Sequence, residues 1–135
     1  MPKIRMKNII KMVDKKKGIK NLNLTINDGE YVVFLWPTGH GKTTTMRILA
    51  GIVKAKEGQI FINDDEVTNY DPEDRNIGFV FEQFALFPHL NVLKNVIYGP
   101  RVRGQNLKMA RKTGEESLLM LLLGKRMKAN PEELS

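Results

Sequence analysis

The segment that most constrains this chain is a glycine-containing loop between a predicted strand and a predicted helix. It reads Trp36-Pro37-Thr38-Gly39-His40-Gly41-Lys42-Thr43-Thr44. The two glycines let the backbone approach an anion with no Cβ in the way, so the N–H groups of residues 40–44 can point at phosphate oxygens. Lys42 can place its ammonium beside the β- and γ-phosphates of a nucleotide, and Thr43 can offer its hydroxyl to Mg²⁺. The pattern predicts a nucleotide triphosphate site. A glycine-rich turn followed by a lysine by chance is the alternative, and the flanking elements argue against it.

Four segments around this loop have the pattern of β-strands. Apolar and polar residues alternate over residues 22–26 and again over 59–63, which indicates half-buried strands. Tyr31–Leu35 is a continuous apolar run, as in strands that are buried on both faces of a parallel sheet. Ile77–Phe81 is a second short apolar run and is also predicted to be a strand. The run at 31–35 leads directly into the loop and is predicted to be the central strand. Residues 84–90 lack either period and are expected to form a structured loop.

Three helices are predicted. The first covers residues 42–52, and its buried face is expected to carry Met46, Leu49, Ala50 and Val53. The second covers Val92–Tyr98, is capped by Asn91 and ends at Gly99-Pro100. The third covers Leu107–Leu123, with the leucine-rich residues 118–123 facing a partner surface. The fold class is therefore α/β.

Charge and composition exclude several classes of protein. The net charge of +7 suits an anionic partner, but the basic residues are scattered and no aromatic residues interleave with them to stack on bases, which argues against a nucleic-acid-binding module. Cysteine is absent, which excludes disulfides and thiolate metal sites. No apolar run approaches the roughly 20 residues of a membrane span, and the N-terminus lacks the apolar core of a signal peptide. A cytoplasmic protein is expected.

These segments resemble the ATP-binding subunits of ABC transporters, and the resemblance covers nearly the whole chain. Beyond the loop, it is carried by Arg47-Ile48-Leu49-Ala50-Gly51, by residues 75–81 and by Phe84-Ala85-Leu86-Phe87-Pro88-His89-Leu90. The last string is typical of importers, where it leads into the α-helical subdomain that docks on the membrane-spanning subunit. The resemblance implies a P-loop NTPase core with an N-terminal antiparallel β portion in residues 1–83, and the start of that helical subdomain in residues 84–135.

The resemblance also implies ligands and partners. ATP and Mg²⁺ are the expected ligands. A second ATP-binding subunit, in a homodimer, and a membrane-spanning permease subunit are the expected partners, at the inner face of the cell membrane. Residues 131–135 are similar to the approach to the signature Leu-Ser-Gly-Gly-Gln, and Ser135 aligns with the serine that contacts the γ-phosphate bound by the other subunit.

Three departures from the family pattern affect the expected site. Trp36 stands where the loop normally begins with glycine, so the indole either intrudes on the nucleotide and weakens binding or packs sideways on the sheet. Glu82 aligns with the glutamine that senses the γ-phosphate and ligates Mg²⁺, and Gln83 is the alternative with a shift of one residue. Val13 aligns with the adenine-stacking aromatic and can offer only apolar contact.

The family places the Walker B aspartate, the catalytic glutamate and the switch histidine after the signature, so these 135 residues are not expected to hydrolyse ATP alone. The absent Walker B strand would lie beside Tyr31–Leu35, and its loss predicts marginal stability or aggregation. The alternative to an ATP-binding engine is a catalytically inactive nucleotide-binding or docking piece.

Overall fold

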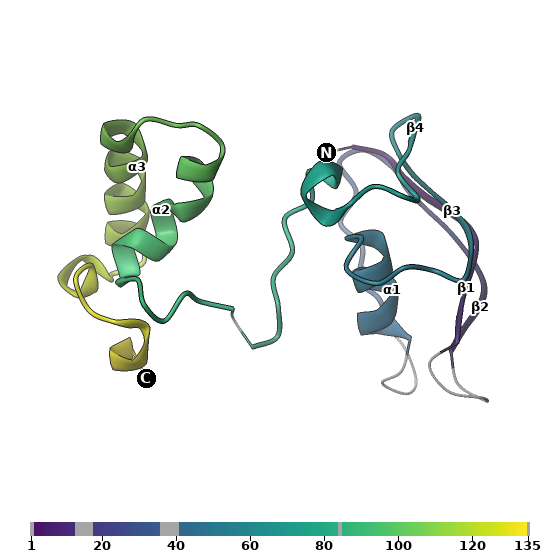
Figure 1. The fold of residues 1–135 in the computed structure, drawn as a ribbon, viewed down its shortest axis with the longest axis horizontal. Coiled ribbons are helices and arrows are strands. Elements are labelled where there is room, and N and C mark those ends of the chain that lie inside the picture. The colour runs from purple at the N-terminus through teal and green to yellow at the C-terminus, as the bar shows by residue number, and fades with distance from the viewer. Residues whose placement is uncertain (1, 13–17, 36–40, 84, 135) are drawn as a thin grey trace. The chain divides into compact units, whose positions relative to one another are not determined.

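The computed structural model describes residues 2–12, 18–35, 41–83 and 85–134 (Figure 1). Contacts between residues divide the chain into two compact units, Met1–Phe79 and Val80–Ser135. The first unit contains a β-sheet and a helix, whereas the second is helical. Each unit is described by itself.

The first unit is built on an antiparallel sheet with strand order β2-β1-β3-β4. Its strands are β1 (Ile4–Met12), β2 (Gly18–Ile26), β3 (Glu57–Ile62) and β4 (Asp65–Glu66). In the registers of β1, Ile4 lies opposite Ile26 on β2 and Ile62 on β3. The strands predicted at 22–26 and 59–63 are confirmed within β2 and β3. The sequence pattern had not indicated β1, although it lies between them.

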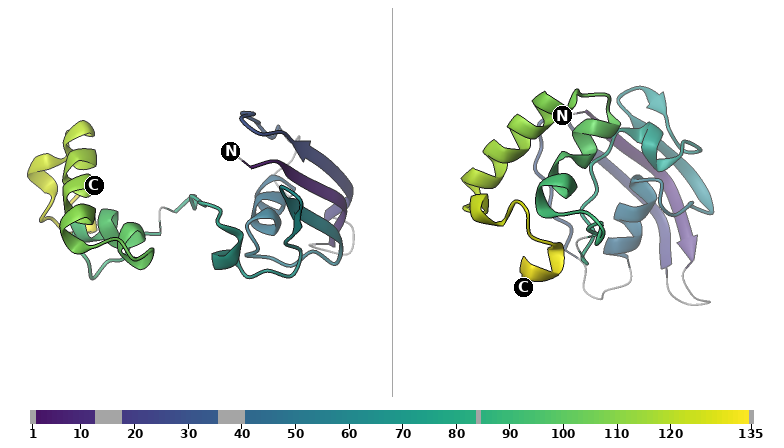
Figure 2. Two further views of the ribbon diagram at one scale, coloured as in Figure 1. Left: turned by 90° about the horizontal axis from the view of Figure 1, so that it is seen from above. Right: turned by 60° about the vertical axis from the view of Figure 1, so that its left-hand side comes forward.

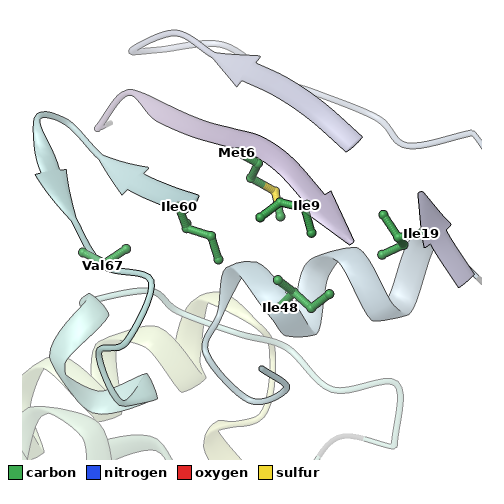
Figure 3. Close-up of a cluster of buried hydrophobic side chains, with 6 residues drawn as sticks. All are labelled: Met6, Ile9, Ile19, Ile48, Ile60 and Val67. Carbon is green, nitrogen blue, oxygen red and sulfur yellow. The ribbon is translucent and has the colours of Figure 1, made fainter. Parts of the chain in front are cut away.

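Helix α1 (Lys42–Leu49) packs on one face of this sheet and closes the core (Figure 2). Ile48 of α1 meets side chains from three strands and from the chain beyond β4, as Figure 3 shows. The buried side chains of this cluster are Met6, Ile9, Ile19, Ile48, Ile60 and Val67. Burying a side chain of this size contributes about 1.5–3 kcal/mol, so the cluster is the main source of stability in the unit.

The predicted buried face of α1 is wrong in part. Thr45 and Ile48 are the buried residues of the helix, whereas Met46 is 45% exposed. A threonine can occupy the buried face because its hydroxyl donates to Gly41 O at 2.8 Å. That bond satisfies the only polar group of the side chain, which removes most of the cost of burying it.

The strands predicted at Tyr31–Leu35 and Ile77–Phe81 do not form in this chain. Neither segment is part of a strand, and Tyr31 is 91% and Leu35 87% exposed. A strand buried on both faces needs hydrogen-bonded neighbours and a covering layer. The four strands of the described residues leave both segments outside the sheet. Both segments therefore have the apolar composition of buried strands, but neither takes part in the sheet.

The second unit is built on two packed helices, α2 (Val92–Val102) and α3 (Leu107–Met120). Asn91 caps α2 as predicted, because its Oδ1 accepts from Lys94 N at 2.9 Å. The predicted end at Gly99-Pro100 is wrong, since Pro100 lies inside α2. Proline removes one helical hydrogen bond, but Arg103 N still donates to Gly99 O at 3.1 Å and the turn continues. Three short 3-10 helices complete the described chain: η1 (Pro72–Arg75), η2 (Gly124–Arg126) and η3 (Pro131–Leu134).

Gly114 lies where α3 closely approaches α2. A Cβ at this position would lie 2.5 Å from Ile97 Cγ2 and 3.3 Å from Leu93 Cδ1. Gly114 is buried, and Ala110 and Leu118 share its face one turn away on either side. The glycine that weakens the helical pattern in the sequence is therefore what lets the two helices pack.

The C-terminal end of α3 is closed by a Schellman motif with a leucine in the position that favours glycine. Leu122 has φ +62°, and its N–H donates to Leu119 O at 3.0 Å while Leu123 N donates to Leu118 O at 2.8 Å. A left-handed conformation costs a residue with a Cβ about 1–2 kcal/mol. The side chain gains little in return, because Leu122 is 91% exposed. Only Leu118 of the predicted partner-facing run is buried.

We predict that Leu122→Gly raises the free energy of unfolding by about 1 kcal/mol, because glycine adopts this conformation without strain. Urea unfolding followed by circular dichroism measures the change. Leu121→Gly is the matched control, since Leu121 is also exposed but has φ −86°. A gain of the same size in the control would show that loss of exposed apolar surface, not relief of strain, is responsible.

Candidate functional site

The described part of the glycine-containing loop is the start of α1. Gly41 is the N-cap residue and is buried, and its carbonyl oxygen accepts from both Thr45 N and Thr45 Oγ1 at 2.8 Å. The N–H groups of the first turn of a helix have no acceptor inside the helix and carry its partial positive charge. The first turn of α1 contains no acidic side chain that would neutralise that charge. Lys42 and Thr43 are exposed at this end. Backbone donors, an ammonium and a hydroxyl are thus gathered where an anion can reach them.

The far end of α1 is held by Arg75, which is only 5% exposed. Its Nη1 donates to Ile48 O at 3.0 Å and to Leu49 O at 2.9 Å, among the last carbonyls of the helix. Its Nη2 and Nε donate to Thr68 O at 3.0 Å and to Tyr70 O at 3.1 Å, in the chain that follows β4. Burial lowers the pKa of Arg75, but an arginine remains charged at any physiological pH.

The backbone at the end of α1 is shaped around this guanidinium. Gly51 has φ +80°, and a Cβ there would lie 2.8 Å from Arg75 Nε. Glycine is therefore required at this position for two reasons: the backbone has a positive φ, and the Arg75 side chain leaves no room for a Cβ. Arg75 ties the helix that carries Lys42 and Thr43 to the rest of the first unit. Arg75 is one of the residues 75–81 that carry the family resemblance, but the resemblance gives it no role. Nothing in the local sequence marks it as buried.

The described part of the predicted docking segment, residues 85–90, is held by α2 within the second unit. Phe87 N donates to Asn95 Oδ1 at 2.8 Å, and Asn95 Nδ2 donates to Phe87 O at 3.1 Å and to Leu90 O at 2.8 Å. The Phe87 ring also packs on Tyr98, with centroids 4.3 Å apart. Residues 85–90 have no helix or strand, as predicted. Leu86 remains 51% exposed, so the segment is fixed at its backbone while apolar surface stays open.

Comparisons with known proteins bear on the family to which the chain belongs. The ABC transporter family matches residues 19–135, which is most of the chain. The spermidine/putrescine import ATP-binding protein PotA of Vibrio cholerae is 40% identical over 134 residues, covering 99% of this chain and 36% of that protein. The sn-glycerol-3-phosphate import ATP-binding protein UgpC of Escherichia coli (strain K12) is 38% identical over 136 residues, covering 100% of this chain and 38% of that protein.

A solved structure of an ATP-binding cassette has a similar fold. It is the dimeric post-hydrolysis state of the ATP-binding cassette MJ0796 bound to ADP and Pi, with a TM-score of 0.83 and 31% identity. The match covers 98% of this chain and 63% of that one. This chain belongs to the ABC transporter family. The predicted resemblance and the predicted ABC ATPase fold, present as a partial domain, are confirmed. The chain spans about a third of the length of the curated relatives that it matches.

Several residues that the family pattern assigns to the site are not described by the structure. Residues 36–40 of the loop, Val13, Phe84 and Ser135 lie outside the described residues. Glu82 and Gln83 lie in an exposed turn of the second unit. Sensing of the γ-phosphate by Glu82 or Gln83 therefore stays a prediction. Binding of Mg²⁺ by Glu82 together with Thr43 also stays a prediction.

No described helix is long and apolar enough to cross a membrane. In the same part of the chain, no group of three or more His, Cys, Asp or Glu side chains is placed to hold a metal ion.

We predict that Arg75→Met lowers the free energy of unfolding by roughly 2–4 kcal/mol, because it removes the side-chain donor to the carbonyl oxygens of Leu49, Thr68 and Tyr70. Ile48 O keeps its bond from Gly51 N at 3.1 Å. Urea unfolding gives the value. Arg47→Met is the control, since Arg47 lies exposed on the same helix and its loss should cost less than about 1 kcal/mol. Equal losses in the two variants would contradict the role assigned to Arg75.

Proposed function

We propose that this chain binds MgATP at the start of α1 and forms the nucleotide-binding portion of the ATP-hydrolysing subunit of an ABC importer. The observation that carries the proposal is the helix start itself. The buried Gly41 begins α1, Lys42 and Thr43 are exposed there, and the first turn contains no carboxylate. An anionic phosphate chain is the ligand that such a helix end stabilises.

Each described residue has a definite part in this proposal. The first-turn N–H groups of α1 bind phosphate oxygens, and Lys42 neutralises charge between the β- and γ-phosphates. Thr43 supplies one oxygen ligand to Mg²⁺. The absence of a carboxylate cluster among the described residues fits this use, because Mg²⁺ usually keeps several waters and is shared with substrate phosphates. When bound, Mg²⁺ would offset the charge of the β- and γ-phosphates.

The wider role of the parent protein is part of the same proposal. The two curated relatives named above have different import substrates in their names, so what this chain shares with them is the ATP-binding engine, not the choice of solute. Residues 84–90 are proposed to dock on a membrane-spanning permease subunit, and Phe87 within them is held by Asn95 and Tyr98. A second ATP-binding subunit would complete the nucleotide site, as the dimeric structure of MJ0796 suggests, and the assembly would sit at the cytoplasmic face of the membrane. Hydrolysis is proposed to require groups beyond this chain.

We predict that Lys42→Ala weakens MgATP binding at least tenfold in isothermal titration calorimetry, because it removes the cation nearest the terminal phosphates. Lys20→Ala is the control for net charge, since Lys20 is exposed on β2, and it should leave the Kd unchanged. No measurable heat from the unsubstituted, folded chain at millimolar MgATP would refute the proposal. Phosphate release by the unsubstituted chain alone would refute the division of labour but not the binding.

We predict that Trp36→Gly tightens MgATP binding several-fold, because glycine restores the residue type that the family uses at the entrance of the loop. Calorimetry compares the two affinities. Trp36 is the single tryptophan of the chain, so its fluorescence reports whether MgATP changes its surroundings. An unchanged Kd together with an unchanged emission would place the indole away from the nucleotide.

A further inference from the structure

A basic corner with exposed aliphatic side chains joins α2 to α3. The turn is closed by Gly104 N to Arg101 O at 3.0 Å and by Gln105 N to Pro100 O at 3.0 Å, and Arg101 Nη1 also donates to Gln105 O at 3.0 Å. Asn106 then caps α3 by accepting from Met109 N at 2.8 Å. The backbone of the corner is therefore held in one conformation. We call this surface the α2–α3 corner; its members are Arg101, Val102, Arg103, Leu107, Lys108, Met109, Arg111 and Lys112.

The apolar side chains of the α2–α3 corner face solvent. Val102 is 70%, Leu107 56% and Met109 52% exposed. Val102 ends α2 and Leu107 begins α3, so only four residues separate these two positions. The side chains on the packed face of α3 are instead Ala110, Gly114 and Leu118. Exposed aliphatic groups that the helix pair does not use are thus gathered at one end of it.

The charge of the corner has a single sign over a long stretch. Residues 99–114 contain five Arg or Lys and no Asp or Glu. The first carboxylates beyond them, Glu115 and Glu116, pair with Arg111 at 2.7 Å and Lys112 at 4.0 Å. The first turn of α3 contains Lys108 and no acidic residue. The side-chain charge and the partial charge of the helix N-terminus are therefore both positive there. Such an arrangement disfavours the helix and strengthens the attraction for an anion.

We propose that the α2–α3 corner binds the surface of a bilayer that contains anionic phospholipid. Cations surrounding aliphatic side chains are the combination that such an interface recognises, because the headgroups attract the charges while the apolar groups enter the acyl boundary. A nucleic acid would use the cations but not Val102 and Leu107, and the corner offers no aromatic ring on which a base could stack. The closed turn limits the conformational entropy lost on binding.

The position of the corner in the second unit supports the same ligand. Tyr98, which packs on Phe87 of the docking segment, lies one helical turn before Val102 on α2. A docking segment that contacts a membrane-spanning subunit would bring this end of α2 close to the lipid. This step rests on the proposed function, whereas the charge and the exposed side chains do not.

Vesicle co-sedimentation of the full chain tests the proposal. Vesicles of phosphatidylcholine with about one-third phosphatidylglycerol should bind the chain, vesicles of phosphatidylcholine alone should not, and binding should weaken as salt is raised. Arg103→Gln with Lys108→Gln should reduce the partition coefficient by about 25-fold, since about 1 kcal/mol for each cation near the surface corresponds to about fivefold. Val102→Ser with Leu107→Ser should reduce it roughly tenfold.

Matched controls lie near the other end of α3. Lys125→Gln with Lys128→Gln removes the same charge from exposed positions, and Leu119→Ser with Leu121→Ser removes similar exposed apolar surface. Both controls should bind vesicles within about twofold of the unsubstituted chain. An equal loss in the lysine control would mean that the overall charge of +7 is responsible, and an equal loss in the leucine control would mean that exposed apolar surface anywhere is sufficient. Either result would overturn the proposal. Tighter binding to a DNA duplex than to the anionic vesicles at the same salt would also overturn it.

The nucleotide assay separates this inference from the proposed function. All four double variants are far in sequence from the loop at 36–44 and should keep the MgATP affinity of the unsubstituted chain. A chain that binds MgATP but not the anionic vesicles refutes the bilayer proposal alone. A chain that binds these vesicles through the corner but not MgATP refutes the nucleotide proposal alone.

Discussion

The buried guanidinium of Arg75 is the contact on which the geometry of the phosphate-binding end depends. A helix of eight residues is too short to be stable by its own hydrogen bonds, so its position is set by what holds its ends and its buried face. Arg75 satisfies two carbonyls at the C-terminal end of α1 and joins them to the chain after β4. Because the helix is rigid, fixing that end also fixes where Lys42 and Thr43 present their side chains.

The core of the first unit explains why one apolar segment is used and another is not. Ile48 completes a layer with the inner face of the β1–β3 sheet, so each apolar residue there loses contact with water. The run at 31–35 has a composition as apolar as any strand of the chain, yet it stays exposed. Hydrophobic burial needs a second surface, and the described residues offer none to this run. A prediction from composition alone could not contain that information.

Local sequence signals predicted the elements whose causes are local. Asn91 capped a helix and the alternation at 22–26 formed a strand, because capping and period depend on neighbouring residues only. The sequence pattern did not reveal β1 because a register shift between Met6 and Ile9 breaks the alternation of apolar and polar residues. Asn8 has φ +51° within this irregular part of the strand. The roles of Arg75, Asn95 and Gly114 depend on partners 27, 8 and 17 residues away, which no period reveals.

Nucleotide binding and docking, the two activities proposed for this chain, depend on separate sets of contacts. The start of α1 is held by Thr45 and, through the helix, by Arg75, and both lie in the first unit. The docking segment is held by Asn95 and Tyr98, both in the second unit. A substitution in one set therefore removes none of these contacts in the other set. Glu82 and Gln83 also lie in the second unit, so their role toward the γ-phosphate has to be tested with that unit folded.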